Sequence, residues 1–136
     1  MSQDIELLLK DLSGRLPYGV KMNHIADNEQ NPKTLIGIDR DYVSLQSTAG
    51  YSYVPAEDYK PYLFPLSSMT EEIMDEIYNI TGVYDIDVDS PVHIEVGTTF
   101  EDLTKIFNIL NKHHIDYHGL IPMGLALDAT GLGIYP

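Results

Sequence analysis

Apolar residues recur along this chain with two different spacings, and the switch between them constrains the fold more than any other feature. In residues 3–13 they recur at intervals of three and four, which predicts an amphipathic helix between Ser2 and Gly14. Alternation with a period of two predicts short strands at residues 20–24, 34–38, 42–46 and near 51–54. Residues 39–41 join two of these strands as a hairpin turn. The first half of the chain therefore combines a helix with short antiparallel strands.

Two sequences typical of helix N-termini occur in the second half. Residues 68–71 and 98–101 each place a hydroxyl three positions before a glutamate, which is the pattern of a capping box. We expect the first to open a helix that buries Ile73, Met74 and Ile77. We expect the second to open a helix that runs to about His113 and buries Leu103, Ile106, Phe107 and Leu110. Residues 83–88 and 92–96 lie between them as a predicted hairpin, and the proline-rich residues 55–66 are predicted as an extended, packed loop.

These elements predict an α+β fold, an antiparallel sheet of about five strands with two or three helices packed on one face. A length of 136 residues is typical of one domain, so we expect a single globular domain over residues 1–136. The apolar residues at 119–136 are predicted to pack back onto this body. The chain has no cysteine, which excludes disulfides, thiolate catalysis and zinc sites with cysteine ligands. We expect a core formed by apolar packing, with no cofactor.

Acidic side chains give the chain a formal net charge of −13. Such a surface repels nucleic acid and anionic lipid and attracts basic partners. Solubility alone is the alternative explanation of this charge. The first ten residues lack the basic start and long apolar run of a signal peptide, and no segment approaches the length of a membrane span. We therefore expect a protein of a reducing compartment, with no membrane partner and no direct nucleic-acid partner.

The predicted hairpin at residues 83–96 carries the most regular pattern of charge. Its polar face is expected to present Asp85, Asp87, Asp89, His93 and Glu95. We interpret Asp85, Asp87, Asp89 and Glu95 as a site for a basic partner, because a regular anionic row can imitate a nucleic-acid backbone and occupy a basic groove. One alternative is a divalent-metal site or metal-dependent enzyme that uses Asp85, Asp87, His93 and Glu95. The other is a solvated strand face without a ligand.

Aromatic residues and prolines gather in residues 51–65. Tyr51, Tyr53 and Tyr59 are candidates for a further part of the partner-binding surface, because aromatic side chains are enriched at protein interfaces. The alternative is that these side chains cover one edge of the core. A third interpretation is a structural or assembly protein whose aromatic segment forms a homodimer interface.

Three histidines and an aspartate fall within residues 113–118. His113 and His114 occupy the last turn of a predicted helix, where the helix dipole favours an imidazolium. A zinc site would need His114, Asp116 and His118 to converge, and the end of a helix explains the first two histidines without it. The chain has no Gly-x-Ser-x-Gly motif and no glycine-rich phosphate loop. We therefore expect no catalytic residues, and these features favour a non-enzymatic protein over the metal-dependent enzyme kept as the alternative.

Two phrases, KPYLFPLSSMTEE at residues 60–72 and HHIDYHGLIPMGLALDA at residues 113–129, resemble small uncharacterised proteins of Bacteroides phages, prophages and mobile elements. RLPYGVK at residues 15–21 is also similar to sequences of that group. The resemblance implies a bacterial cytoplasmic setting and an accessory protein that binds a host protein, and it supplies no catalytic residues. Together with the charge, it favours an anti-defence inhibitor, similar in kind to anti-CRISPR proteins, that contacts a basic nucleic-acid-binding host effector.

Overall fold

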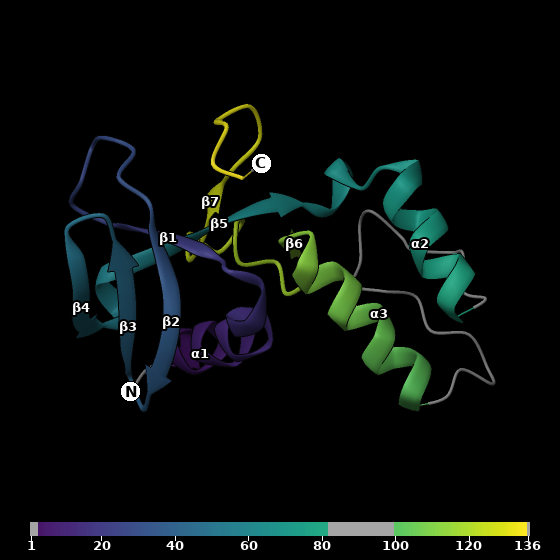
Figure 1. Ribbon diagram of the computed structural model, residues 1–136, viewed down its shortest axis with the longest axis horizontal. Coiled ribbons are helices and arrows are strands. Elements are labelled where there is room, and N and C mark those ends of the chain that lie inside the picture. The colour runs from purple at the N-terminus through teal and green to yellow at the C-terminus, as the bar shows by residue number, and fades with distance from the viewer. Residues whose placement is uncertain (1–2, 82–99, 136) are drawn as a thin grey trace.

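The described part of the chain forms a twisted sheet and three α-helices, arranged as in Figure 1. The computed structural model describes residues 3–81 and 100–135. The helices are α1 (Gln3–Arg15), α2 (Glu71–Thr81) and α3 (Phe100–Lys112). The strands are β1 (Lys21–His24), β2 (Lys33–Asp39), β3 (Tyr42–Ser47), β4 (Gly50–Pro55), β5 (Tyr59–Pro65), β6 (Ile115–Asp116) and β7 (Leu127–Asp128). The sheet order is β4-β3-β2-β1-β5-β6, and β7 also pairs with β5.

The pairing of the strands confirms the predicted α+β class. Neighbours from β4 to β5 are antiparallel, whereas β5 pairs in parallel with the short strands β6 and β7. Seven strands are described where about five were predicted, because β5, β6 and β7 add to the four strands that alternation indicated. The predicted strands at residues 83–88 and 92–96 lie outside the described residues. The apolar C-terminal segment packs back as predicted, since β7 joins the sheet through β5.

Local sequence signals identified the first half of the chain well. The predicted helix forms as α1 and continues two residues beyond the predicted end, to Arg15. Strands β2 and β3 form the predicted hairpin, in which Asp39 pairs with Tyr42 around a two-residue turn. Arg40 adopts a left-handed conformation in this turn, with φ of 57°, as tight hairpin turns require.

One strand was missed, because residues 55–66 were predicted as an extended loop. Proline has no backbone N–H to donate to a ladder, so Pro61 and Pro65 argued against a strand. The structure nevertheless places Pro61 opposite Met22 of β1 and continues β5 to Pro65. Tyr62 and Leu63 are buried in β5, and their burial outweighs the lost donors.

The N-terminus of α2 differs from the prediction by two residues. The hydroxyl of Thr70, rather than that of Ser68, caps the helix by accepting a hydrogen bond from the N–H of Ile73 at 3.2 Å. Ser68 instead ends a 3-10 helical turn, Leu66–Ser68. Ser68 and Thr70 are both residues that can cap a helix N-terminus. Because the 3-10 turn includes Ser68, α2 begins after Thr70 instead.

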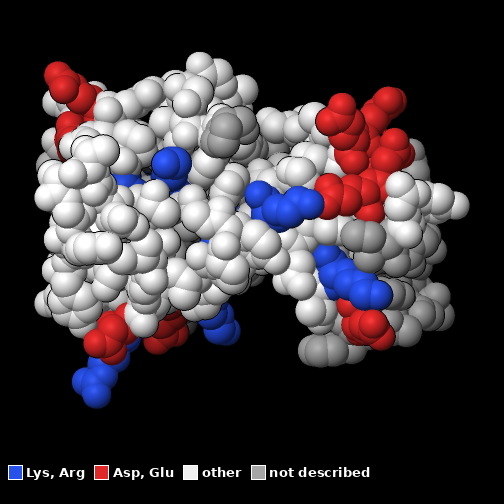
Figure 2. Space-filling model, viewed as in Figure 1, with Lys and Arg blue, Asp and Glu red and all other residues white. Residues whose placement is uncertain are grey.

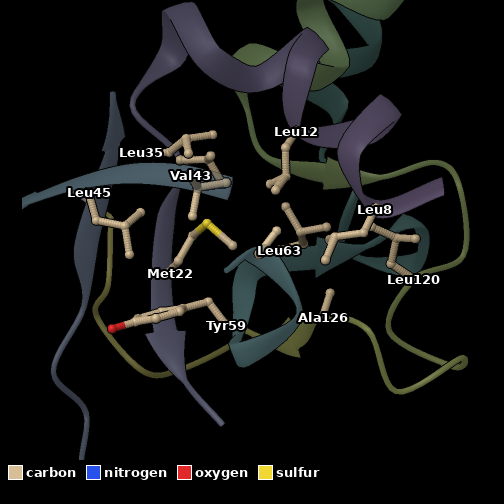
Figure 3. Close-up of a cluster of buried hydrophobic side chains, with 12 residues drawn as sticks. Leu8, Leu12, Met22, Leu35, Val43, Leu45, Tyr59, Leu63, Leu120 and Ala126 are labelled. Carbon is tan, nitrogen blue, oxygen red and sulfur yellow. The ribbon is translucent and has the colours of Figure 1, made fainter. Parts of the chain in front are cut away.

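Apolar side chains of the sheet and of α1 form the larger hydrophobic cluster, which we call the sheet core. Leu8 and Leu12 of α1 face Met22 and Leu63 of the sheet (Figure 3). The other members are Val20, Leu35, Val43, Leu45, Ala56, Tyr59, Leu120 and Ala126. This packing follows directly from the spacing of leucines in α1 and from alternation in the strands, which placed Leu35, Val43 and Leu45 on one face.

A second cluster, which we call the helix-pair core, lies between α2, α3 and β6. It contains Ile73, Ile77, Ile106, Ile109, Leu110, Ile115 and Tyr117. Burial of Ile73, Ile77, Ile106 and Leu110 confirms the predicted inner faces of both helices. Met74, Leu103 and Phe107 are only half-buried, although they were predicted to be inside.

A buried ion pair connects the two cores. Arg15 at the end of α1 donates from Nε to Oδ1 of Asp11 at 2.5 Å and from Nη2 to the carbonyl of Ile115 at 2.6 Å. Both charged side chains are fully buried. The guanidinium also lies 5.0 Å from the centre of the Tyr117 ring. Because Ile115 and Tyr117 belong to the helix-pair core, this contact holds α1 against β6.

Candidate functional site

The acidic residues predicted to bind a partner, Asp85, Asp87, Asp89 and Glu95, lie outside the described residues, as does His93. The partner and metal interpretations of this hairpin therefore stay predictions. Within residues 3–81 and 100–135, no group of three His, Asp or Glu side chains is arranged to hold a metal ion. No helix in the same two ranges is long and apolar enough to cross a membrane.

The three tyrosines predicted to join that surface do not lie together. Tyr51 and Tyr53 project from β4 and are 75% and 57% exposed. Tyr59 is 6% exposed and belongs to the sheet core, where its ring meets the edge of the His24 ring at 5.0 Å between centroids. Tyr59 therefore covers the core, which was the alternative interpretation for the segment, while Tyr51 and Tyr53 are available at the surface.

A tyrosine face forms on the outer side of β3 and β4, which we define as Tyr42, Tyr51 and Tyr53. The rings of Tyr42 and Tyr53 stack at 5.0 Å and 16°, and the Tyr53 hydroxyl donates to Oδ2 of Asp39 at 2.9 Å. This hydrogen bond to a carboxylate raises the pKa of Tyr53. Cross-strand pairing produces the face, because Tyr51 and Tyr53 lie opposite Gln46 and Ser44 while Val43 and Leu45 point into the core.

The His113–His118 segment ends α3, as predicted, and its polar side chains diverge. The helix stops at Lys112, and His114 takes the left-handed conformation of a helix C-terminus, with φ of 60°. Both carboxylate oxygens of Asp116 accept backbone hydrogen bonds at 2.8 Å, from Leu120 and Ile121. His118 instead donates to Asp11. The set His114, Asp116 and His118 is therefore not a zinc site.

Asp11 of α1 is buried and contacts both Arg15 and His118, so it links this segment to α1. Burial raises the pKa of Asp11, but hydrogen bonds from His118 and Arg15 outweigh burial and hold the pKa below its ordinary value. Nδ1 of His118 lies 2.7 Å from Oδ2 of Asp11. A buried carboxylate that orients a partly exposed imidazole resembles part of a catalytic triad, yet the same contact simply neutralises Asp11.

A cavity of about 420 Å³ opens beside the end of α3. It is lined by Phe64, Ser68, Thr70, Ile73, Lys112, His113, His114, Ile115 and Tyr135. Five separate segments meet there: the end of β5 with the turn after it, the start of α2, the end of α3, β6, and the C-terminal segment that carries Tyr135. The volume is in the range of small-molecule pockets.

His114 forms one wall of the cavity together with Tyr135. The two rings are stacked at 3.7 Å and 13°. The hydroxyl of Tyr135 donates to the carbonyl of Tyr62 at 2.8 Å and accepts from the N–H of Lys21 at 2.9 Å, which fixes its position. Burial, followed by the nearby charges of Arg15 and other basic groups, lowers the pKa of His114 to about 4. The expected imidazolium is therefore wrong for His114, because loss of solvent outweighs the helix dipole.

Glu76 of α2 contacts two basic side chains that line the cavity. Its carboxylate accepts from Nζ of Lys112 and lies 2.8 Å from Nε2 of His113. The hydrogen bond from Lys112, with a weaker contribution from His113, holds the pKa of Glu76 below its ordinary value. The cavity lining therefore includes two basic side chains, Lys112 and His113, and both already contact the carboxylate of Glu76, which lies outside the lining.

Sequence reasoning found His113 and His114 but missed the cavity. Ser68 and Thr70 were assigned to capping, and Tyr135 was part of a segment predicted only to pack against the body. The isolated tyrosine near the end of a glycine-rich apolar stretch was the one available signal, since such a ring requires a packing site and a partner for its hydroxyl.

Comparison with known proteins gives no relative. No protein-family model matches the chain, and neither the curated proteins nor the solved structures include a match.

Proposed function

We propose that the protein is a small non-enzymatic binding protein whose acidic surface contacts a basic protein partner. The observation that carries this proposal is the uneven distribution of charge. Residues 67–136 hold twelve of the 21 acidic residues but only two of the eight basic residues. An uneven field of this kind steers an oppositely charged partner toward one part of a protein.

The surface of α2 supports the proposal within the described residues. Acidic side chains gather over α2 in the space-filling view (Figure 2). Glu71 and Glu72 in the first turn of the helix are exposed, as is Asp75. Glu76 differs from Glu71 and Glu72, because Lys112 and His113 contact its carboxylate. The residues we propose for the partner are therefore Glu71 and Glu72, together with the predicted site at Asp85, Asp87, Asp89 and Glu95.

The proposed partner is a nucleic-acid-binding host effector, and the proposed setting is the bacterial cytoplasm. Support for the setting is the resemblance of residues 60–72 and 113–129 to phage and mobile-element proteins. Support for the partner is the charge, because a groove that binds phosphates also attracts rows of carboxylates. Inhibition of a defence nuclease is the activity that would follow from occupation of such a groove.

Affinity capture from a bacterial lysate tests this proposal with two matched variants. E71Q/E72Q removes two carboxylates from the first turn of α2, and D4N/E6Q removes two from the first turn of α1. We expect the first variant to retain several-fold less partner than the wild type, and the second to retain as much. Added duplex DNA and raised salt should both release the partner. Equal capture by both variants at all salt concentrations contradicts the proposal.

A second candidate function, self-assembly, is favoured by the tyrosine face. Tyr51 and Tyr53 project from β4, which is an edge of the described sheet. Exposed edge strands offer unpaired backbone groups to a second chain, and large aromatic side chains stabilise such contacts. The test is sedimentation velocity over a range of concentrations. Y51S/Y53S should lower the dimer fraction, whereas Y78S, on α2, should leave it unchanged; a wild-type chain that stays monomeric removes this candidate.

A further inference from the structure

We propose that the cavity between β5, α2, α3 and Tyr135 binds an uncharged planar heterocycle with hydrogen-bonding edges, of the size of a nucleobase or nucleoside. This site is independent of the proposed protein partner. The cavity has about 420 Å³ of space and lies where the described chain brings five segments together. Three properties determine the class of ligand: flat aromatic walls, neutral polar groups in the lining, and basic lining residues that are already paired with Glu76.

The aromatic lining favours a flat ligand. The stacked rings of His114 and Tyr135 are fixed by the two hydrogen bonds of the Tyr135 hydroxyl. The Phe64 ring lies 6.0 Å from that of Tyr135, at 52°. Ile73 and Ile115 provide apolar side chains from α2 and β6. Rigid aromatic surfaces of this kind stabilise planar ring systems by stacking, as they do for bases in nucleic-acid-binding proteins.

The polar lining favours a ligand that both donates and accepts hydrogen bonds. His114 is 8% exposed, and its Nδ1 has no hydrogen-bond partner in the described chain. A buried polar atom without a partner is unfavourable, so a ligand that supplies one gains binding energy. Because Nδ1 is closed to solvent, the ligand reaches it only when the His114 ring shifts toward the cavity. Thr70 Oγ1 accepts from the N–H of Ile73, which leaves its O–H able to donate into the cavity. The Ser68 hydroxyl, also in the lining, can donate or accept.

The charges around the cavity favour a neutral ligand over an anion or a cation. Glu76 already contacts both Lys112 and His113, so an anionic ligand would have to displace a carboxylate that is part of the protein. The net charge of −13 opposes an anion further. A cation would meet the ammonium group of Lys112 in the lining. An uncharged ring avoids both costs.

Isothermal calorimetry, combined with methyl and amide NMR of the full chain, tests the site with three probes. Adenosine is the expected ligand type, adenosine 5′-monophosphate adds charge, and indole keeps the flat ring but has one donor and no ring acceptor. We expect adenosine to bind and to shift the resonances of Ile73 and Ile115, with the monophosphate at least tenfold weaker. No shift with any probe at millimolar concentration overturns the proposal, and so does tighter binding of the monophosphate than of adenosine.

Variants locate the binding and separate it from stability. H114F keeps a stacking ring but removes both ring nitrogens, and we expect at least a tenfold loss of adenosine affinity with indole unaffected. H24F is the matched control, because His24 packs on Tyr59 outside the cavity. Since H114F must keep φ of 60°, S68F provides a second variant that fills the cavity without changing that residue, and it should abolish binding. Unchanged adenosine binding in folded H114F or S68F overturns the proposal.

Discussion

The sheet core and the helix-pair core bury their apolar surface in different ways. In the sheet core, Leu8 and Leu12 of α1 meet leucine, valine and methionine side chains from several strands, so each side chain is held by neighbours from distant parts of the chain. The helix-pair core is formed mainly by isoleucines, with Leu110 and Tyr117, and these residues come from α2, α3 and the segment around β6. Most of the excess negative charge lies in residues 67–136, the half of the sequence that forms the helix-pair core. The more extensive apolar packing and the greater excess of negative charge therefore occur in different parts of the molecule.

The contact between the regions should have the largest effect when it is broken. Arg15→Met leaves Asp11 buried with the His118 ring as its remaining hydrogen-bond partner, and removal of one member of a buried ion pair typically costs about 3–5 kcal/mol. We expect a decrease of that size in the free energy of unfolding, measured in urea. Lys10→Met, on an exposed position of α1, is the control and should change it by less than about 0.5 kcal/mol. A loss below about 1 kcal/mol for Arg15→Met would mean that the two cores are held together by other contacts.

One substitution in each core tests whether the regions unfold together. Leu12→Ala and Ile77→Ala each remove a fully buried side chain, and each should destabilise by about 2–5 kcal/mol. If the cores unfold as one unit, each variant will show a single shifted midpoint of unfolding. Circular dichroism and tyrosine fluorescence will then report the same midpoint within that variant. Ile25→Ala, at an exposed apolar side chain, is the control. Two separate transitions in Ile77→Ala would show that the helix-pair core unfolds alone.

Acid should destabilise the cavity side of the molecule through His114. Its pKa is about 4 in the folded protein against 6.5 in an unfolded chain, so the unfolded state binds the proton more readily. The contribution of neutral His114 is complete above pH 6.5 and is lost as the pH falls toward 4. Between pH 7 and pH 5 this amounts to about 2 kcal/mol. Asp11 and Glu76, whose pKa values are lowered, lose their contributions only at lower pH.

The measurement for this prediction is urea unfolding at pH 7 and at pH 5. Wild type should lose about 2 kcal/mol more than H114F over this interval, because phenylalanine does not titrate. Equal losses in both proteins would mean that His114 is not kept neutral by its surroundings.

The smallest expected effect is confined to one helix. Thr70→Ala removes the hydroxyl that caps α2 and should lower the free energy of unfolding by about 1 kcal/mol. Thr70→Ser keeps the acceptor and should be close to wild type. Hydrogen exchange at the N–H of Ile73 should increase in the alanine variant, while exchange in β2 and β3 follows only the global change. Ser68→Ala is a further control and should leave the capping of α2 unchanged, because Ser68 does not cap the helix.

Prediction from the sequence succeeded where the determining contacts are local. The spacing of Leu8 and Leu12 indicated α1, and the pattern around Arg40 indicated the hairpin. It failed at β5, where burial of Tyr62 and Leu63 overrides the two prolines. Local propensity cannot reveal such an override, because it depends on which strands lie alongside.

The candidate sites divide in the same way. Exposure of Tyr51 and Tyr53 and burial of Tyr59 depend on how far the strands extend, which alternation alone did not settle. The neutral state of His114 depends on Tyr135, 21 positions further along the chain, so only the folded structure could show it. The predicted acidic site at Asp85, Asp87, Asp89 and Glu95 stays a prediction.

The bond from Arg15 to the Ile115 carbonyl joins positions one hundred residues apart. During synthesis on the ribosome, α1 emerges early, and the carbonyl that completes its buried charge emerges much later. Until then, Arg15 can pair with Asp11 but lacks the Ile115 carbonyl, so α1 cannot reach its final environment. Formation of this bond closes a very long loop, which predicts that α1 docking against β6 is a late and slow event in folding.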